Sequence, residues 1–305
     1  MKSIHIANSD LVVSEISLGC MRISGMSSAE ISNLIHTAID GGINFFDHAD
    51  IYGGGQSEAK FAEALDMTPA LRETMFIQSK CGIRKGMFDF SKEHILEAVD
   101  GSLKRLQTDY LDVLLLHRPD ALVEPEEVAE AFTILQDSGK VRYFGVSNQN
   151  PMQIELLKKY VRQPLIINQL QFSITNTTMI DAGINVNMED DFSVNRDGSI
   201  LDYCRLHDIT IQPWSPFQYG FFEGTFLDND KFPELNQRID ALAAEKGVTN
   251  TAIAIAWILR HPAHMQPIVG TTNADRVKAI CRASDISLTR KEWYDIYLAA
   301  GNRLP

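Results

Sequence analysis

Four residues with side chains suited to proton transfer follow three successive apolar segments of the chain: Asp47, Tyr52, Lys80 and His117. A phenol has a pKa near about 10, and an adjacent ammonium lowers such a pKa by about 1–3 units. Lys80 would supply that cation to Tyr52, and Asp47 would hold the ammonium in place and keep it charged. Neutral His117 would donate a hydrogen bond to a carbonyl oxygen and direct it at the phenol. These side chains are therefore suited to adding hydride to a carbonyl carbon while the phenol protonates the oxygen.

The hydride itself must come from outside the protein, because no amino-acid side chain supplies one. This chemistry needs a nicotinamide cofactor or its equivalent. A carboxamide must be hydrogen-bonded to fix which face of the ring points inward, and Ser147, Asn148 and Gln169 offer donors and acceptors after two neighbouring apolar segments. Trp214 follows the next segment, where it could stack under the ring. These four residues are the predicted nicotinamide site.

A second polar group surrounds the start of a helix expected after the last apolar segment: Thr271, Thr272, Asn273 and Arg276. Free backbone amides at a helix N-terminus, together with a guanidinium, suit a phosphate, which favours NADPH over NADH. The chain has no Gly-x-Gly-x-x-Gly after a strand and no Gly-Lys-Ser/Thr phosphate loop. Cofactor binding of a barrel type is therefore expected, and not the doubly wound type.

The elements that position these residues alternate between strand-like and helical patterns in one unbroken series. Helical spacing is clear, for example, from Ile31 to Ile39, after a capping box formed by Ser27 and Glu30. Strands are predicted at residues 16–19, 43–46, 75–78, 113–116, 141–144, 165–168, 209–212 and 267–269. Eight such units predict a TIM (β/α)8 barrel of the α/β class, with residues 1–305 as a single domain. In that fold, the residues after each strand converge on one mouth.

Two segments depart from the repeat. Residues 3–6 and 11–13, on either side of Asn8-Ser9-Asp10, predict a short N-terminal β-hairpin. Residues 173–196 form a long polar connection, for which we expect either a lid or a disordered segment. Long loops at the C-terminal face of the barrel are therefore part of the predicted fold.

Composition and charge restrict the classes of partner. The 28 basic and 40 acidic side chains give a net charge of −12, so the field of the protein repels nucleic acids and anionic lipids. The four cysteines lie far apart with no Cys-x-x-Cys pair, so no disulfide and no metal site is expected. The N-terminus has no apolar signal segment, which predicts a cytoplasmic protein. The expected partner is a small carbonyl substrate, and the expected state is a monomer or a weak homo-oligomer.

The chain resembles the aldo-keto reductases over essentially its whole length. The segment 46–53, Phe-Asp-His-Ala-Asp-Ile-Tyr-Gly, is similar to that family's Asp-Thr-Ala-x-x-Tyr-Gly segment, and Lys80 and His117 follow at the family's positions. The resemblance implies that Tyr52 is the proton donor, that Lys80 and Asp47 adjust its pKa, and that His117 orients the substrate. Residues 18–22 and the phrase His-Arg-Pro-Asp at 117–120 are similar to a bacterial branch of oxidoreductases in that family.

The resemblance extends to segments that bind the cofactor, namely 145–148, 168–169, 214–217 and 270–276. The residues implied to contact it are Met21, Arg22, Ser147, Asn148, Gln169, Trp214, Ser215, Phe217, Gly270, Thr271, Thr272 and Arg276. Three departures stand out. His48 replaces a threonine, Ala279-Ile280 replace the Glu-Asn pair that holds the adenine in many members, and Gly270 stands where some members carry lysine. The last departure weakens the preference for NADPH, so NADH remains an alternative.

Three other functions fit parts of the same pattern. A lysine at a strand end beside a phenol also suits a barrel lyase, in which Lys80 would be a Schiff-base nucleophile. A metal-dependent hydrolase fits less well, because the segment 47–50 offers no His-x-His pair. A protein that binds nicotinamide and senses its redox state with little turnover would carry the same residues as a slow enzyme. The physiological substrate and the preferred direction of reaction are left open by these residues.

Overall fold

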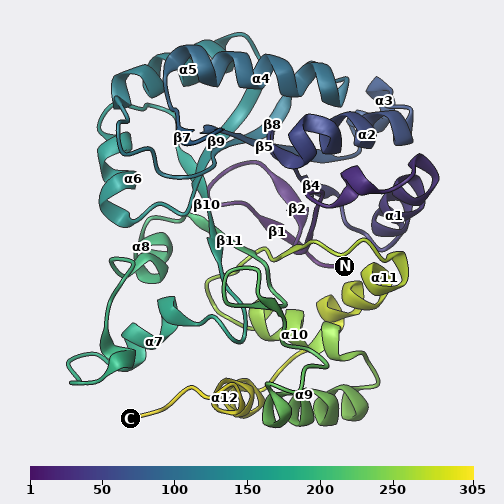
Figure 1. Cartoon of the computed structure of the whole chain (residues 1–305), viewed down its shortest axis with the longest axis vertical. Coiled ribbons are helices and arrows are strands. Elements are labelled where there is room, and N and C mark those ends of the chain that lie inside the picture. The colour runs from purple at the N-terminus through teal and green to yellow at the C-terminus, as the bar shows by residue number, and fades with distance from the viewer.

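Eight parallel strands form the centre of the computed structural model, which describes residues 1–305 (Figure 1). In sequence they are β3 (Ser17–Gly19), β4 (Phe45–Asp47), β5 (Phe76–Cys81), β8 (Leu111–Leu116), β9 (Val141–Ser147), β10 (Leu165–Gln171), β11 (Thr210–Trp214) and β14 (Ile268–Val269). From β3 to β11 each strand pairs with the next in the series, and β14 pairs with β3. The Gln266 backbone N–H donates to the Ile211 oxygen at 3.0 Å and joins β11 to the segment before β14. The predicted (β/α)8 barrel is confirmed.

Helices surround the strands on the outside (Figure 1). The outer layer contains α1 (Ser28–Asp40), α2 (Gln56–Leu65), α4 (Lys92–Leu106), α5 (Pro125–Asp137), α6 (Pro151–Lys158), α8 (Ile200–Leu206), α9 (Pro233–Lys246), α10 (Asn250–Leu259) and α11 (Ala274–Cys281). Their apolar faces pack against the outward-facing side chains of the strands, such as Phe46, Ile77 and Leu114. The capping box predicted before α1 is present, with Ser27 and Glu30 each accepting a hydrogen bond from the other's backbone N–H. None of the helices combines the length and the apolar composition of a membrane-spanning segment.

The N-terminal hairpin closes one end of the barrel. It consists of β1 (Ser3–His5) and β2 (Val12–Ser14), which pair antiparallel as predicted. Apolar side chains from this hairpin and from the barrel interior form a separate buried cluster: Ile6, Leu11, Val13, Phe45, Val113, Leu115, Ile166 and Ile167. Because this end is filled, the polar residues at the other strand ends face the open, C-terminal side of the barrel.

The C-terminal side also carries short additional elements. Two small hairpins lie in the loops after β5 and β11, namely β6 (Ile83–Arg84) with β7 (Met87–Phe88), and β12 (Gln218–Tyr219) with β13 (Gly224–Thr225). Two 3-10 turns, η1 (Ile23–Gly25) and η2 (Tyr52–Gly55), also follow strands at this side, whereas α3 (Pro69–Arg72) and η4 (Arg282–Asp285) follow outer helices at the opposite end of the barrel. The predicted long loops at this face are therefore partly ordered into hairpins and turns.

The polar segment 173–196 is neither disordered nor a lid over the strand ends. It contains α7 (Thr178–Ile184) and η3 (Asp191–Ser193), and it packs beside α12 (Arg290–Ala299), a helix that was not predicted. The Tyr297 hydroxyl of α12 donates to the Asp181 carboxylate at 2.7 Å, and the Arg303 guanidinium lies 5.4 Å from the Phe192 ring centroid. Met179 and Ile180 are buried. These contacts attach the segment to the C-terminal residues of the chain. The polar composition of the segment gives no indication of this packing.

Candidate active site

The four residues predicted to transfer a proton meet at the C-terminal end of the barrel. Lys80 Nζ donates three hydrogen bonds, to Asp47 Oδ2 at 2.9 Å, to the Tyr52 hydroxyl at 3.0 Å and to the His48 backbone oxygen at 2.7 Å. The His117 ring lies edge-on to the Tyr52 ring, with centroids 5.8 Å apart. Asp47 ends β4, Lys80 lies near the end of β5 and His117 follows β8, so three neighbouring strands bring the cluster together.

A glycine turn fixes the position of Tyr52. Gly53, Gly54 and Gly55 all have positive φ, at 59°, 64° and 89°, in the region that L side chains rarely occupy. At Gly53 space also excludes a side chain, because a Cβ there would lie 2.5 Å from Ser24 Cβ. The chain can therefore turn back immediately after Tyr52 and keep the phenol over the end of β5.

The charges in the cluster follow from burial and pairing. Burial alone would lower the pKa of Lys80, but the adjacent Asp47 carboxylate and Tyr52 raise it above its usual value, so the ammonium stays charged. Burial lowers the pKa of His117 well below its usual range, and the charges of Lys80 and Arg118 act in the same direction. The imidazole is therefore neutral at physiological pH.

The pKa of Tyr52 moves against the direction expected from the sequence. Lys80 does lower it, but burial raises it more, so the pKa of the phenol lies above its usual value. The sequence indicates the neighbouring ammonium, but the loss of hydration around the phenol depends on burial in the folded chain. In the free protein Tyr52 is consequently protonated throughout the physiological range.

A chain of buried glutamines continues from Asp47 to the floor of the barrel. Gln78 and Gln169 both donate from Nε2 to Asp47 Oδ1, at 2.6 and 3.0 Å, and to Gln212 Oε1, at 2.9 and 3.2 Å. Gln212 donates to Gln266 Oε1 at 2.8 Å, and Gln266 donates to the Ser14 backbone oxygen of β2 at 2.7 Å. With Lys80, Asp47 therefore accepts three hydrogen bonds, and its carboxylate is held in one orientation.

Sequence reasoning missed three of these glutamines. Gln78 lies two positions before Lys80 in β5, and side chains two apart in a strand point to the same face. Gln212 and Gln266 also precede strand-end positions of the predicted site. In a strand, a residue at an even number of positions from an inward-facing residue also faces inward, and this spacing was the available signal. The sequence does not indicate which glutamines on different strands would form hydrogen bonds with one another.

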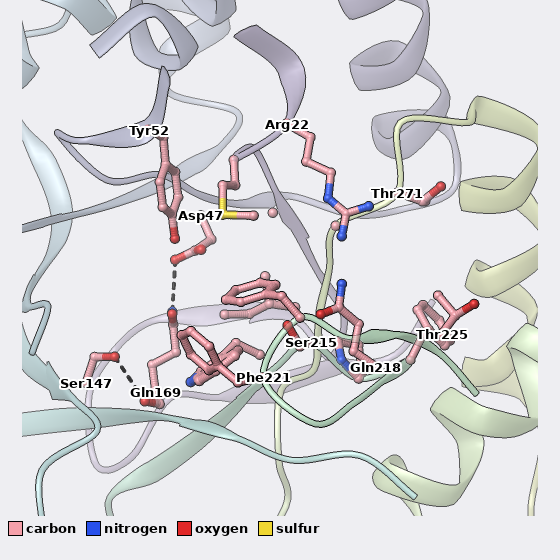
Figure 2. Close-up of a pocket in the computed structure, with 18 of the residues that line it drawn as sticks. Arg22, Asp47, Tyr52, Ser147, Gln169, Ser215, Gln218, Phe221, Thr225 and Thr271 are labelled. Atoms are coloured by element: carbon pink, nitrogen blue, oxygen red, sulfur yellow. Dashed lines mark hydrogen bonds between the residues drawn. The ribbon is translucent and has the colours of Figure 1, made fainter. Parts of the chain in front are cut away.

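A cavity of about 890 Å³ opens beside Tyr52, Asp47 and His117. Figure 2 shows Tyr52, Asp47 and Gln169 at one end of this pocket and Thr271 at the other, with Arg22 between them. The predicted cofactor residues that line the cavity are Met21, Arg22, Ser147, Asn148, Gln169, Trp214, Ser215, Phe217, Gly270, Thr271 and Arg276. Lys80 lies directly behind Tyr52 and Asp47. Thr272 is exposed to solvent and does not line the cavity.

The predicted nicotinamide residues are joined by hydrogen bonds. The Asn148 amide donates to Ser147 Oγ at 2.7 Å, Ser147 donates to the Gln169 backbone oxygen at 3.1 Å, and Trp214 Nε1 donates to Asn148 Oδ1 at 3.1 Å. Gln169 uses its side-chain nitrogen for Asp47 and Gln212, whereas its Oε1 accepts no hydrogen bond from the protein. An acceptor left free at the cavity wall fits the NH₂ group of a carboxamide.

Two positive charges line the cavity away from Tyr52. Arg22 and Arg276 both line it, and neither forms an ion pair with a carboxylate of the chain. Asn273 caps α11 by accepting from the Arg276 backbone N–H at 2.9 Å, which fixes the start of this helix beside Thr271. A helix N-terminus with one unpaired guanidinium, and a second unpaired guanidinium in the same cavity, fit a phosphate-bearing cofactor.

Aromatic side chains that the sequence analysis did not identify line the mouth of the cavity. Phe221 and Phe222, in the loop between β12 and β13, pack against Trp214 with ring centroids 6.3 and 5.9 Å away. Both phenylalanines are largely exposed to solvent. They lie several residues beyond the end of β11, in a hairpin, and not at the strand end itself, so the barrel pattern gives no signal for them.

His48 and Asp50, which lie between Asp47 and Tyr52 in sequence, take no part in the hydrogen bonds of the cluster through their side chains. The His48 ring packs edge-on against Phe61 of α2 at 4.6 Å, and burial lowers the pKa of this imidazole to about 3. Burial, with Glu58 nearby, raises the pKa of Asp50 to about 7. No group of three or more His, Cys, Asp or Glu side chains is placed to hold a metal ion.

Known proteins resemble the chain over almost its full length. The sequence profile of the Aldo/keto reductase family matches residues 15–298. The oxidoreductase YcsN of Bacillus subtilis is 37% identical over 98% of this chain and 98% of its own length. A 6-dehydroglucose reductase of Novosphingobium aromaticivorans is 34% identical over 99% of this chain and 96% of its own. The crystal structure of a thermostable aldo-keto reductase with the inhibitor epalrestat superposes with a TM-score of 0.78 at 25% identity, covering 98% of this chain and 100% of that one.

Proposed function

Because the chain belongs to the aldo/keto reductase family, whose members use nicotinamide cofactors, we propose that it reduces an aldehyde or a ketone to an alcohol with NADPH. One observation carries the proposal: a protonated Tyr52 hydroxyl lies 3.0 Å from the charged Lys80 ammonium, beside neutral His117 in the wall of one cavity. This arrangement provides a proton donor, a cation to receive the charge that remains, and a neutral hydrogen-bond donor for the substrate.

Tyr52 would donate the proton to the carbonyl oxygen as negative charge develops on that atom. The phenolate that remains would lie next to Lys80 Nζ, where charge-assisted hydrogen bonding stabilises it. Asp47 keeps this ammonium in place, and Gln78 and Gln169 hold Asp47 in turn. The barrel interior thus holds the cation in position before reaction, so little reorganisation is needed when the charge appears.

His117 would orient the carbonyl oxygen toward Tyr52. Its Nδ1 is buried and has no hydrogen-bond partner, so a proton on Nε2 is the tautomer that avoids burying an unpaired N–H. That tautomer leaves the Nε2 N–H free to donate to a substrate oxygen. The low pKa of the imidazole keeps this donor neutral.

The residues present suit a nicotinamide dinucleotide. When bound, the cofactor supplies the hydride that no side chain can provide. Ser147, Asn148 and Gln169 would hold the carboxamide, and Trp214 would lie against the ring. Arg22 and Arg276 would hold phosphate, which supports NADPH over NADH.

Two other functions differ from this proposal in different ways. A Schiff-base lyase needs a neutral amine, whereas Lys80 is charged and its three N–H groups are all bonded within the protein. A redox sensor would share every residue of the site, so turnover alone separates it from an enzyme.

The test is oxidation of NADPH, and separately of NADH, with a panel of aldehydes and ketones that includes 6-dehydroglucose, the substrate named for one relative. Turnover with NADPH supports the proposal. Tight NADPH binding with negligible turnover on every carbonyl would indicate a sensor, and a borohydride-trapped adduct on Lys80 would indicate a lyase. A protein that neither binds NADPH nor oxidises it with any carbonyl would refute the proposal.

A further inference from the structure

A guanidinium without an anionic partner lies beside the proton-transfer residues. Arg118 directly follows His117 and lines the same cavity, where it is half-buried. It forms none of the ion pairs of the chain and donates no side-chain hydrogen bond to another residue. Its Cζ lies 5.5 Å from the centroid of the Trp214 ring, so the aromatic face supports the side chain without neutralising it.

The carboxylates around Arg118 are engaged elsewhere. Of the two that line the cavity, Asp47 is bonded to Lys80 and two glutamines, and Asp228 accepts from the Asn250 side chain at 3.0 Å. Asp120, two residues after Arg118, accepts from the backbone N–H groups of Phe90 and Leu122 at 2.9 and 2.8 Å. The chain therefore offers Arg118 no counter-ion, although it carries 40 acidic side chains.

An unpaired, partly desolvated arginine in a cavity is costly unless a ligand supplies the missing charge. The guanidinium fork matches a carboxylate with two parallel hydrogen bonds. Arg22 and Arg276 are assigned to the cofactor phosphates, whereas Arg118 adjoins His117 and Tyr52, where the carbonyl must lie. Its position therefore suits a group on the substrate.

We propose that Arg118 binds a carboxylate of the substrate, and that the natural substrate is an aldehyde or ketone carrying an acidic group. This inference rests on the proposed reductase function and adds the substrate class. It also means that the neutral sugar aldehyde named for one relative is a poorer substrate here than an anionic carbonyl compound of similar size.

The test compares two aldehydes that place a carboxylate at different distances, succinic semialdehyde and 4-carboxybenzaldehyde, each with its neutral methyl ester. We expect wild-type kcat/KM with NADPH to favour at least one acid over its ester by about 10- to 100-fold, the range for a hydrogen bond to a charged group. In Arg118→Met this acid-to-ester ratio should fall by the same factor. Arg118→Lys should keep part of the preference, because an ammonium retains the charge without the fork. The control Arg162→Met, which alters an exposed arginine outside the cavity, should keep the wild-type ratio.

An acid-to-ester ratio that is the same in wild type and Arg118→Met would overturn the inference, and Arg118 would then only line the pocket. Turnover of the esters in that case would still support the reductase function. If no aldehyde is reduced, the proposed function fails, and calorimetric titration of NADP⁺-saturated protein with 4-(hydroxymethyl)benzoate decides the binding role separately. Binding at least about ten-fold tighter to wild type than to Arg118→Met would support a carboxylate site. Equal binding, or none, would overturn it.

Discussion

The glutamine chain below Asp47 makes the substitution Gln212→Glu a sharp test of the barrel interior. Gln212 is fully buried; its Oε1 accepts from Gln78 and Gln169, and its Nε2 donates to Gln266. A protonated glutamic acid keeps all three bonds, because its carbonyl oxygen accepts and its hydroxyl donates. An ionised carboxylate loses the bond to Gln266 and adds a negative charge near Asp47. We therefore expect the folded variant to retain this proton far above the usual pKa of glutamate.

The expected loss of stability follows from that shift. Full burial raises the pKa of a carboxyl group by about 3–5 units from about 4.3. Since the unfolded chain then loses the proton at a lower pH than the folded one, the free energy of unfolding falls as pH rises from the unfolded pKa to the folded pKa. At about 1.36 kcal/mol per unit, Gln212→Glu should lose about 3–4 kcal/mol relative to wild type between pH 5 and pH 8.

Urea unfolding at pH 5 and pH 8, followed by circular dichroism, measures this loss for wild type and variant. The matched control is Gln237→Glu on α9, where the side chain is exposed and a carboxylate stays hydrated. For that control, the difference from wild type in the free energy of unfolding should be the same at pH 5 and pH 8. If the free energy of unfolding of Gln212→Glu also differs from that of wild type by the same amount at both pH values, the conclusion that the glutamine chain is dry and fully hydrogen-bonded is refuted.

Three further predictions concern stability and the position of Tyr52. The pKa of Asp50, about 7 when folded, lies above its unfolded value, so folding is disfavoured as pH rises through this range. Asp50→Asn should therefore raise the free energy of unfolding, measured in urea, by a few kcal/mol at pH 8 and by less at pH 5. An equal increase at both pH values would contradict the raised pKa of Asp50. Tyr297→Phe removes the hydrogen bond to Asp181 and should lower the free energy of unfolding by about 1–3 kcal/mol. It should leave aldehyde kcat/KM unchanged, because no residue of 173–196 lines the cavity, and a large drop in kcat/KM would show that this segment does affect the active site. Gly53→Ala should reduce aldehyde turnover far more than Gly54→Ala, because a Cβ at position 53 meets Ser24, whereas position 54 has a similar φ and open space for a Cβ. Equal turnover in the two variants would show that the contact with Ser24 does not constrain Tyr52.

The sequence predicts the barrel and the proton-transfer residues because both depend on local patterns. Apolar runs and helix signals repeat eight times, and a parallel barrel brings the residues after each strand together whatever the details of packing. Asp47, Lys80 and His117 lie at or just after the ends of three strands that are neighbours in the barrel, so their meeting could be inferred without coordinates.

Other features depend on packing that no local pattern encodes. The contacts among Gln78, Gln169 and Gln212 require the relative heights of strands far apart in sequence, and the raised pKa of Tyr52 requires the extent of its burial. The helix α7 was hidden in a polar segment, because its stabilising contact, Tyr297 to Asp181, joins residues 116 positions apart. Thr272 fits a phosphate site by spacing alone, yet it is exposed just before the N-cap of α11 and does not line the cavity.

The central claim is that Tyr52 gives the proton to the substrate oxygen beside Lys80. The most direct test is the single-turnover rate of NADPH oxidation by a saturating aldehyde in wild type and in Tyr52→Phe, with the dissociation constant of NADPH measured for both. Removal of a general acid should slow this step by about 10²- to 10⁴-fold while NADPH binding stays close to that of wild type. A Tyr52→Phe variant that oxidises NADPH at the wild-type rate would contradict the claim.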